Sequence, residues 1–173
     1  GREVLGVRRL GKRLVLALTD DRFLVLHLMI AGRLRWKKRG ASHRARSVLA
    51  VIDSPTGSLV FTEASKKKRA SVHLVVGEEA LADFDRGGLE PLGLSPEAFE
   101  ERLRSERHTL KRSLTDPRLF SGIGNAYSDE ILFEAGLSPV RMSTALEADE
   151  VVRLQAATEA VLVRYTDRIR DEV

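Results

Sequence analysis

The sequence predicts an α+β protein in which an antiparallel β-sandwich or barrel precedes an α-helical domain. Short apolar segments separated by turn residues fill the chain up to about residue 85, as expected for strands. Beyond that point the signals are helix caps, a helix-starting proline and a helix-ending glycine. The segment between the two regions holds three glycines and a proline. We therefore predict a β-rich domain over residues 1–84, a linker over 85–94 and a helical domain over 95–173.

Strands are expected throughout the first domain, and two of the turns between them have characteristic residues. Thr19-Asp20-Asp21 and Ser54-Pro55-Thr56-Gly57 are typical of hairpin turns, so neighbouring strands should pair antiparallel. The expected strands are Glu3–Arg9, Arg13–Leu18, Phe23–Leu28, Gly32–Trp36, Ser47–Ile52, Ser58–Thr62 and Ser71–Val76.

Capping residues mark the helices of the second domain. Ser95 is an N-cap candidate, and Pro96 suits the first helical position after it. Gly136 is placed to end a helix, while Ser143 and Thr144 are expected to cap the last one. The expected helices are Pro96 to about Arg104, about Glu106–Leu114, Asn125–Ala135, and about Glu147 to Arg170.

Composition excludes several classes of protein. The 173 residues are 43% hydrophobic, enough to bury a core, but no apolar run approaches the roughly 20 residues that cross a bilayer. No signal peptide opens the chain, so we expect a cytoplasmic protein, associated with the nucleoid in a bacterium. With no cysteine and only scattered histidines, we expect no metal and no cofactor within this chain. The histidines are His27, His43, His73 and His108.

Positive charge is clustered, which favours an anionic partner. The 29 lysines and arginines exceed the 25 aspartates and glutamates, for a net charge of +4 and a pI near 9.7. Any single basic run is more often an ordinary solvated face, but four runs together indicate nucleic acid. The runs are Arg8 to Arg13, Lys37 to Arg46, Lys66 to Arg69 and Arg102 to Arg112.

A glycine turn that enters a helix is the strongest functional motif. Gly122 and Gly124 allow successive amides to point the same way, and Asn125 is placed to cap the helix that follows. The positive end of that helix would then face the same anion. Lys111 lies on a predicted helix and can bring its ammonium there, while Tyr127 offers a hydroxyl near the helix start. The pattern predicts a grip on a nucleic-acid backbone.

These residues resemble the helix-two-turn-helix signature of the formamidopyrimidine-DNA glycosylase/endonuclease VIII family. The first half is similar as well, in the strand pair around Lys12, in the His27–Leu34 segment and in the Phe61–Glu63 strand end. The resemblance therefore covers nearly the whole chain. In the second half it rests on Leu110-Lys111, Asp116, the run from Gly122 to Leu132, and Ala135-Gly136-Leu137-Ser138-Pro139.

The resemblance implies DNA repair. Such enzymes excise oxidised bases from double-stranded DNA after flipping the damaged nucleotide, and then cleave the abasic strand by β-elimination. They act as monomers, and the family often has a C-terminal structural zinc. An N-terminal proline amine and the adjacent glutamate perform the chemistry, and neither is among these residues, nor is the zinc finger. We expect a portion of a longer glycosylase, or alternatively a shortened relative without glycosylase activity.

The resemblance also assigns roles to individual residues. Lys12 matches a lysine near the phosphate of the damaged nucleotide that assists the Schiff-base chemistry. Met29 and Ile30 are the candidates for filling the void left by the flipped base, and Glu130 is expected to be structural. The expected DNA-binding residues are Lys12, Arg46, Lys66, Lys67, Arg107, Lys111, Gly122, Gly124, Asn125 and Tyr127.

The chain departs from the family pattern after Glu63. Relatives have an Asp-Pro-Arg-Arg-Phe-Gly stretch, whereas this chain has Ala64 to Arg69 with three consecutive lysines. Lys66 or Lys67 can contact a phosphate, but a lysine cannot read cytosine through a planar fork as arginine does. We therefore expect discrimination of the opposite base to be weak or different.

Two other interpretations stay open. The chain can be a non-catalytic DNA- or RNA-binding module that uses the same backbone grip, or a scaffold protein whose basic runs serve solubility. Borohydride trapping on abasic DNA separates these from a glycosylase. We expect DNA binding with little trapping, because a lysine such as Lys12 replaces an N-terminal amine poorly at neutral pH.

Overall fold

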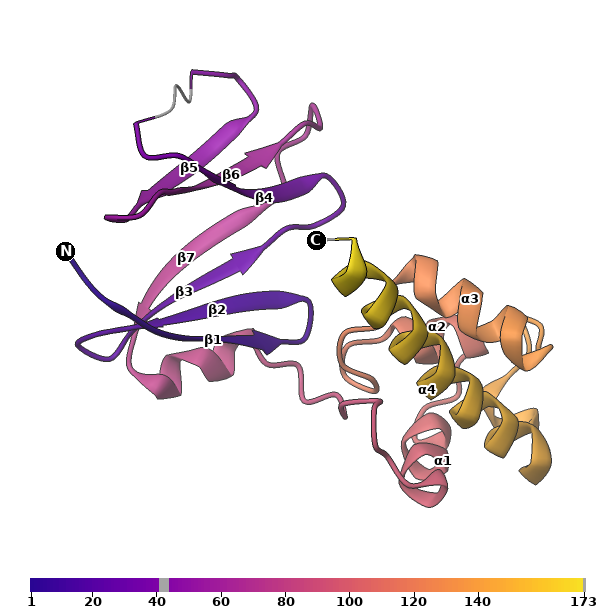
Figure 1. The fold of residues 1–173 in the computed structure, drawn as a ribbon. Helices are drawn as coiled ribbons and strands as arrows, with labels where there is room; N and C mark the ends of the chain where they lie inside the picture. The colour runs from indigo at the N-terminus through magenta and orange to yellow at the C-terminus, as the bar shows by residue number, and fades with distance from the viewer. Residues whose placement is uncertain (41–43, 173) are drawn as a thin grey trace. The chain divides into compact units, whose positions relative to one another are not determined.

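The computed structural model describes residues 1–40 and 44–172, so His43 of the second basic run lies outside the described residues. The chain divides into two compact units, Gly1–Ala82 and Asp83–Val173, whose elements are labelled in Figure 1. In the described residues no helix has the length and apolar character that crossing a membrane requires.

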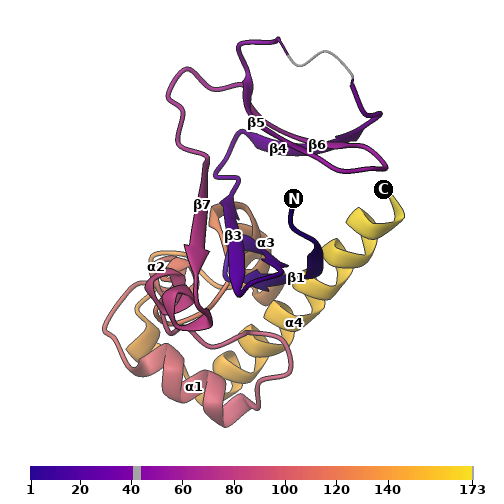
Figure 2. The same ribbon diagram turned by 90° about the vertical axis from the view of Figure 1, so that its left-hand side faces the viewer.

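The first unit is a sandwich of two antiparallel sheets, which appear as separate layers in Figure 2. All seven predicted strands are confirmed, each with its ends within one residue of the prediction. One sheet has the order β1-β2-β3-β7 and the other the order β4-β6-β5. The first sheet contains β1 (Val4–Leu10), β2 (Arg13–Leu18), β3 (Arg22–His27) and β7 (Ser71–Val76); the second contains β4 (Gly32–Lys37), β5 (Val48–Asp53) and β6 (Ser58–Glu63).

Both predicted hairpin turns form. Asp20 and Asp21 adopt positive φ, which aspartate tolerates in tight turns. In the second turn, the Ser54 hydroxyl accepts hydrogen bonds from the amides of Thr56 and Gly57. A 3₁₀ segment, η1 (Glu78–Phe84), follows β7 and buries Leu81.

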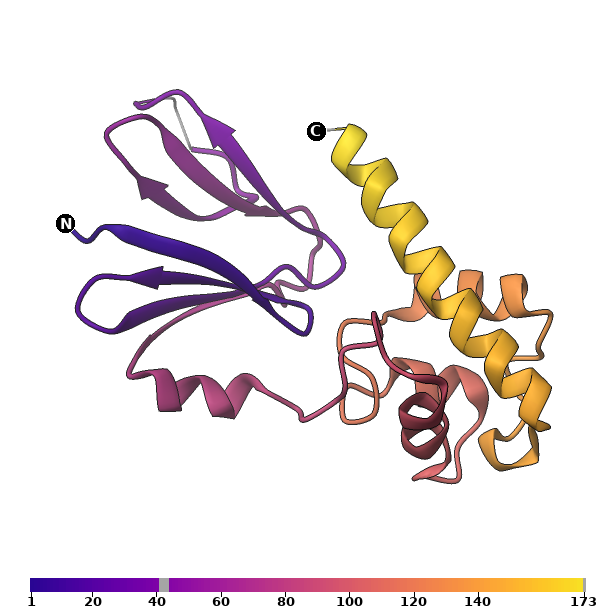
Figure 3. The ribbon, with the colours of Figure 1, turned by 60° about the horizontal axis from the view of Figure 1, so that its bottom comes forward.

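The second unit is helical and packs around one apolar core. Its helices are α1 (Pro96–Arg104), α2 (Leu110–Thr115), α3 (Asn125–Ala135) and α4 (Ala148–Asp171), with a short 3₁₀ turn η2 (Ser143–Ala145) before α4. Figure 3 shows α4 as one long helix beside α3. The bounds of α1 and α3 match their predictions, with Ser95 as N-cap and Gly136 left-handed at the end of α3. Fully buried core residues include Phe99, Leu110, Phe120, Ile131 and Leu154.

The start of the second helix and the cap of the last helix differ from their predictions. The second helix begins at Leu110 rather than near Glu106, because Thr109 is extended and pairs with Met142 while Leu110 donates its amide to Arg141. Ser143 and Thr144 do not cap the last helix, since they lie in η2. Glu147 is the N-cap instead, in a reciprocal capping box with Glu150.

The segment predicted as a linker, residues 85–94, belongs to the second unit and is hydrogen-bonded within it. Leu89 exchanges backbone hydrogen bonds with Leu119 and Ser121, at 3.0 and 2.8 Å. Gly88 lies so close to Pro117 that a Cβ there would come within 2.4 Å of its carbonyl oxygen. These contacts fix the backbone that leads into the glycine turn, because Pro117, Leu119 and Ser121 directly precede it.

Candidate nucleic-acid interface

The glycine turn and the start of α3 form an anion-binding arrangement. Gly122 has φ of 84°, a conformation that few other residues adopt, and buried Ile123 anchors the turn in the core. Gly124 is the N-cap of α3 in extended conformation. Amides in the first turn of a helix have no carbonyl partner one turn earlier, so they are available to an anion.

Asn125 does not cap α3, contrary to the prediction. The helix begins one residue earlier than a capping Asn125 would require, so Gly124 takes the N-cap and no side chain caps it. Asn125 is the first helical residue and is exposed, while its carbonyl accepts a hydrogen bond from the Ser128 hydroxyl at 2.8 Å. Its amide side chain is therefore free to face a ligand at the helix start.

Lys111 contacts α3 through an ion pair with Asp129. It is the second residue of α2, and its amide donates to the Pro139 carbonyl. Its Nζ lies 2.6 Å from Oδ1 and 2.8 Å from Oδ2 of Asp129, which is on the first turns of α3. The Lys111 side chain is 37% exposed and that of Asp129 is 56% exposed, so the pair faces solvent.

Tyr127 is held by an aromatic contact with α4. Its ring packs edge-on against Tyr165, with centroids 5.2 Å apart and planes at 66°. A hydrogen bond from the Tyr165 hydroxyl to Glu130 raises the pKa of that hydroxyl, and burial of the hydroxyl raises it further. Glu130 thus ties α3 to α4, in line with the structural role expected for it.

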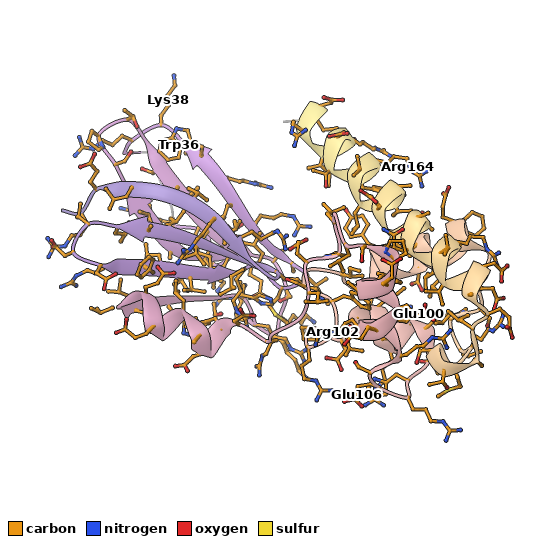
Figure 4. All side chains as sticks on the ribbon, turned by 90° about the horizontal axis from the view of Figure 1, so that it is seen from below. Trp36, Lys38, Glu100, Arg102, Glu106 and Arg164 are labelled. Carbon is orange, nitrogen blue, oxygen red and sulfur yellow. The ribbon has the colours of Figure 1, made fainter. Side chains whose placement is uncertain are left out.

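The fourth basic run does not act as one surface. Arg107 is exposed in the loop before α2, not on the same helix as Lys111. Arg104 is committed to structure, because it pairs with Glu100 at 2.8 Å and donates to the carbonyls of Thr144 and Leu146. Figure 4 labels Glu100, Arg102 and Glu106, which lie on and just after α1.

In the first unit, the predicted site residues lie at one end of the sandwich. Arg13 at the start of β2 pairs with His27 at the end of β3, which pairs with Ser71 at the start of β7. In the other sheet, Gly32 pairs with Glu63, whose amide donates to the Ser47 carbonyl. Lys12, Met29, Ile30, Arg46, Lys66 and Lys67 occupy the turns and loops that join these strand ends (Figure 1).

Lys12 lies in the turn between β1 and β2, where Gly11 has positive φ. The Lys12 side chain is exposed, yet nearby protein atoms desolvate its ammonium and lower its pKa. Burial, then the charges of Arg13 and Lys12, lower the pKa of His27 as well. The turn therefore concentrates positive charge at this end of the unit.

The Met29–Ile30 pair projects from the turn between β3 and β4. Met29 has φ of 53°, unusual for a residue with a side chain, and is 42% exposed. Ile30 is 87% exposed, the largest exposed fraction among the large hydrophobic residues of the described chain. The Gly32 amide closes the turn on the Leu28 carbonyl, and Arg33 donates to the Ile30 carbonyl. An apolar side chain held outward in this way suits insertion between bases.

A buried glutamate organises the lysine loop. Glu63 is only 2% exposed and accepts hydrogen bonds from the Ser65 hydroxyl and from the amides of Arg69 and Ala70. The bond from Ser65 is the main cause of its lowered pKa. Lys66 and Lys67 are exposed on the loop that Glu63 closes, and Arg46 is exposed in the turn before β5.

Not all of the basic runs belong to this end. Lys37 pairs with Ser58 at the far end of β4, so Lys37 and Lys38 lie away from the predicted site residues. Figure 4 shows Lys38 extending from the strands beside Trp36.

Two acidic residues at these sites are not predicted from the sequence. Asp129 is the partner of Lys111, and the only sign of this in the sequence is that residues 111 and 129 flank the glycine turn with opposite charge. Glu63 is predicted only as part of a strand end. A glutamate at the end of an apolar strand, just before a run of lysines, indicates a buried carboxylate that accepts hydrogen bonds.

The residues present do not fit a structural zinc site. The chain has no cysteine, and in its described part no three His, Asp or Glu side chains are grouped to hold a metal ion.

Comparison with known proteins points to one family. The sequence model of the formamidopyrimidine-DNA glycosylase N-terminal domain matches residues 1–79, and that of the formamidopyrimidine-DNA glycosylase H2TH domain matches residues 88–168. The formamidopyrimidine-DNA glycosylase of Moorella thermoacetica is 36% identical over 165 residues, which cover 94% of this chain and 60% of that protein. That of Carboxydothermus hydrogenoformans is 32% identical over 163 residues, which cover 94% and 58% respectively. The chain thus spans about 60% of the length of these relatives.

Solved structures agree with the sequence comparison. A Lactococcus lactis Fpg complex with DNA containing Fapy-dG superimposes with a TM-score of 0.85 at 25% identity, covering 95% of this chain and 62% of that one. A complex of the same protein with DNA containing an abasic site gives the same TM-score and identity, covering 95% and 61%.

Proposed function

This chain belongs to the formamidopyrimidine-DNA glycosylase family, and from that membership we propose that it acts in DNA repair on damaged double-stranded DNA. The reaction proposed is excision of an oxidised base from a flipped nucleotide, followed by β-elimination at the abasic site. The observation that carries the proposal is that the glycine turn leads into the uncapped first turn of α3, and that the exposed Lys111 contacts the same helix at Asp129. Solved complexes of similar proteins with Fapy-dG and abasic DNA support the choice of DNA as the partner.

The second unit is proposed to grip the DNA backbone. Phosphate oxygens would accept hydrogen bonds from the first amides of α3 and from the side chains of Asn125 and Lys111. The Tyr127 hydroxyl near the start of α3 would be a further donor, and Arg107 would add a contact from the loop before α2. Such contacts hold the duplex in position and do not depend on its base sequence. They therefore suit an enzyme that must act on lesions in any sequence.

The first unit is proposed to contact the DNA at the damaged nucleotide. Flipping a nucleotide leaves a gap in the stack, and Met29 or Ile30 would fill it. Lys66, Lys67 and Arg46 would contact phosphates beside the gap. Lys12 would lie near the phosphate of the damaged nucleotide, and its lowered pKa raises the small fraction of neutral amine that can form a Schiff base with an abasic-site aldehyde.

Borohydride trapping on a duplex with an abasic site tests the chemical part of this proposal. We expect these 173 residues to bind the duplex and to give little trapped adduct, because Lys12 replaces a poised N-terminal amine poorly. The small adduct that forms should disappear in Lys12→Ala and persist in the control Lys38→Ala. Efficient trapping that survives Lys12→Ala would contradict the role of Lys12. Binding without any adduct in the wild type would favour a purely DNA-binding module.

A further inference from the structure

The ammonium of Lys111 is occupied in the free protein. Two of its three N–H donors face the two carboxylate oxygens of Asp129, at 2.6 and 2.8 Å. The Asp129 carboxylate thus presents two anionic oxygens to Lys111, as a DNA phosphate would. Both side chains are exposed, so a phosphate can reach the pair from solvent.

The fold does not depend on this ion pair. Lys111 is fixed by its amide bond to the Pro139 carbonyl and by its place in α2 between the buried Leu110 and Ser113. Asp129 is carried by α3, which buries Ser128, Ile131 and Leu132 in the core. Exposed ion pairs add little to stability. The stability of the fold therefore does not explain why the chain has this ion pair.

We propose that Asp129 is a built-in competitor of the DNA phosphate for Lys111. In the free protein it holds the ammonium beside the start of α3, and a phosphate must displace it before Lys111 joins the grip. The carboxylate also repels an approaching phosphate. It therefore weakens binding most for DNA whose backbone makes none of the other contacts of the proposed grip. Asp129 is thus a positioning residue that limits non-specific DNA affinity. This inference rests on the proposed function.

Asp129→Asn in the full chain tests the proposal by equilibrium binding to an undamaged duplex over a range of salt concentrations. The variant should bind about threefold more tightly at low salt, the size expected for loss of an exposed ion pair. Its affinity should also fall more steeply with salt, because the wild-type carboxylate takes up a cation when DNA displaces it. Asp149→Asn is the matched control, since Asp149 is an exposed carboxylate of the same unit paired with Arg153 at 3.6 Å. It should change the affinity less.

The decisive arm repeats Asp129→Asn in a Lys111→Met background. Most of the gain in affinity should be lost there, because the competition needs the ammonium and only the direct repulsion remains. An equal gain in both backgrounds would mean that Asp129 acts only through general repulsion, and an unchanged or weaker affinity of Asp129→Asn would also overturn the proposal. A Lys111→Met variant that binds as well as the wild type would overturn the phosphate role of Lys111 itself, and this inference with it.

Discussion

Single acidic residues in this protein fix the positions of basic ones. Asp129 holds Lys111, Glu63 closes the loop that presents Lys66 and Lys67, and Asp116 holds Arg118. Each carboxylate accepts more than one hydrogen bond, which favours one position for the group that donates to it. The acidic residues are therefore as informative about this surface as the lysines and arginines.

Asp116 makes the stability of the second unit depend on pH. Hydrogen bonds from Arg118 hold the pKa of Asp116 at about 2, below its usual value near 4. A carboxylate with a depressed pKa stabilises the fold fully above its unfolded pKa, and that contribution disappears as the pH falls from about 4 to about 2. We expect a loss of roughly 1–2 kcal/mol over this range, limited by the exposure of Arg118.

Urea unfolding of the wild type and of Asp116→Asn between pH 6 and pH 2 measures this contribution. The difference in unfolding free energy between the two proteins should be largest near neutral pH and shrink below about pH 4. A difference that stays constant across the range would show that the Asp116 carboxylate is not the source.

At the scale of elements, the sequence was most informative where periodicity and caps agreed. The β strands and α1 and α3 were predictable, because alternating apolar residues, Ser95-Pro96 and Gly136 are local signals. The start of α2 was not, since the extended pairing of Thr109 with Met142 brings together residues far apart in the chain. For the same reason, the Lys111–Asp129 and Tyr127–Tyr165 contacts could be read only from the packed helices.

The loop between β6 and β7 is expected to depend on Glu63 for its shape. Glu63→Gln replaces an acceptor oxygen by a donor that faces the amides of Arg69 and Ala70, so the loop should lose its closed form. We predict weaker binding to duplex DNA and a lower melting temperature, with Asp53→Asn as a control at the other end of the same sheet. Hydrogen exchange at Arg69 and Ala70 should speed up in the variant. Unchanged exchange and affinity would contradict the organising role of Glu63.

At the scale of the molecule, two units of different architecture each place their basic residues at a defined end. In the first unit the strand pairing gathers Lys12, the Met29–Ile30 turn, Arg46 and the lysine loop, while Lys38 lies at the other end. In the second unit the glycine turn leads into α3, and Lys111 contacts the same helix at Asp129. The fold class was predictable from the sequence, and so was the position of the glycine turn directly before a helix. The acidic partners of the basic residues were not, because their roles depend on contacts across the fold.

Equilibrium binding to a duplex with an abasic-site analogue, measured over a range of salt concentrations, tests the central claim most directly. Lys111→Ala and Asn125→Ala should each weaken binding by roughly 1–3 kcal/mol, and Lys111→Ala should reduce the salt slope by about one. Lys38→Ala removes an exposed lysine beyond the end of β4, opposite the predicted site residues of the first unit, and should leave both quantities nearly unchanged. Affinities and salt slopes that are the same for the wild type, Lys111→Ala and Asn125→Ala would contradict the claim that this surface grips the DNA backbone.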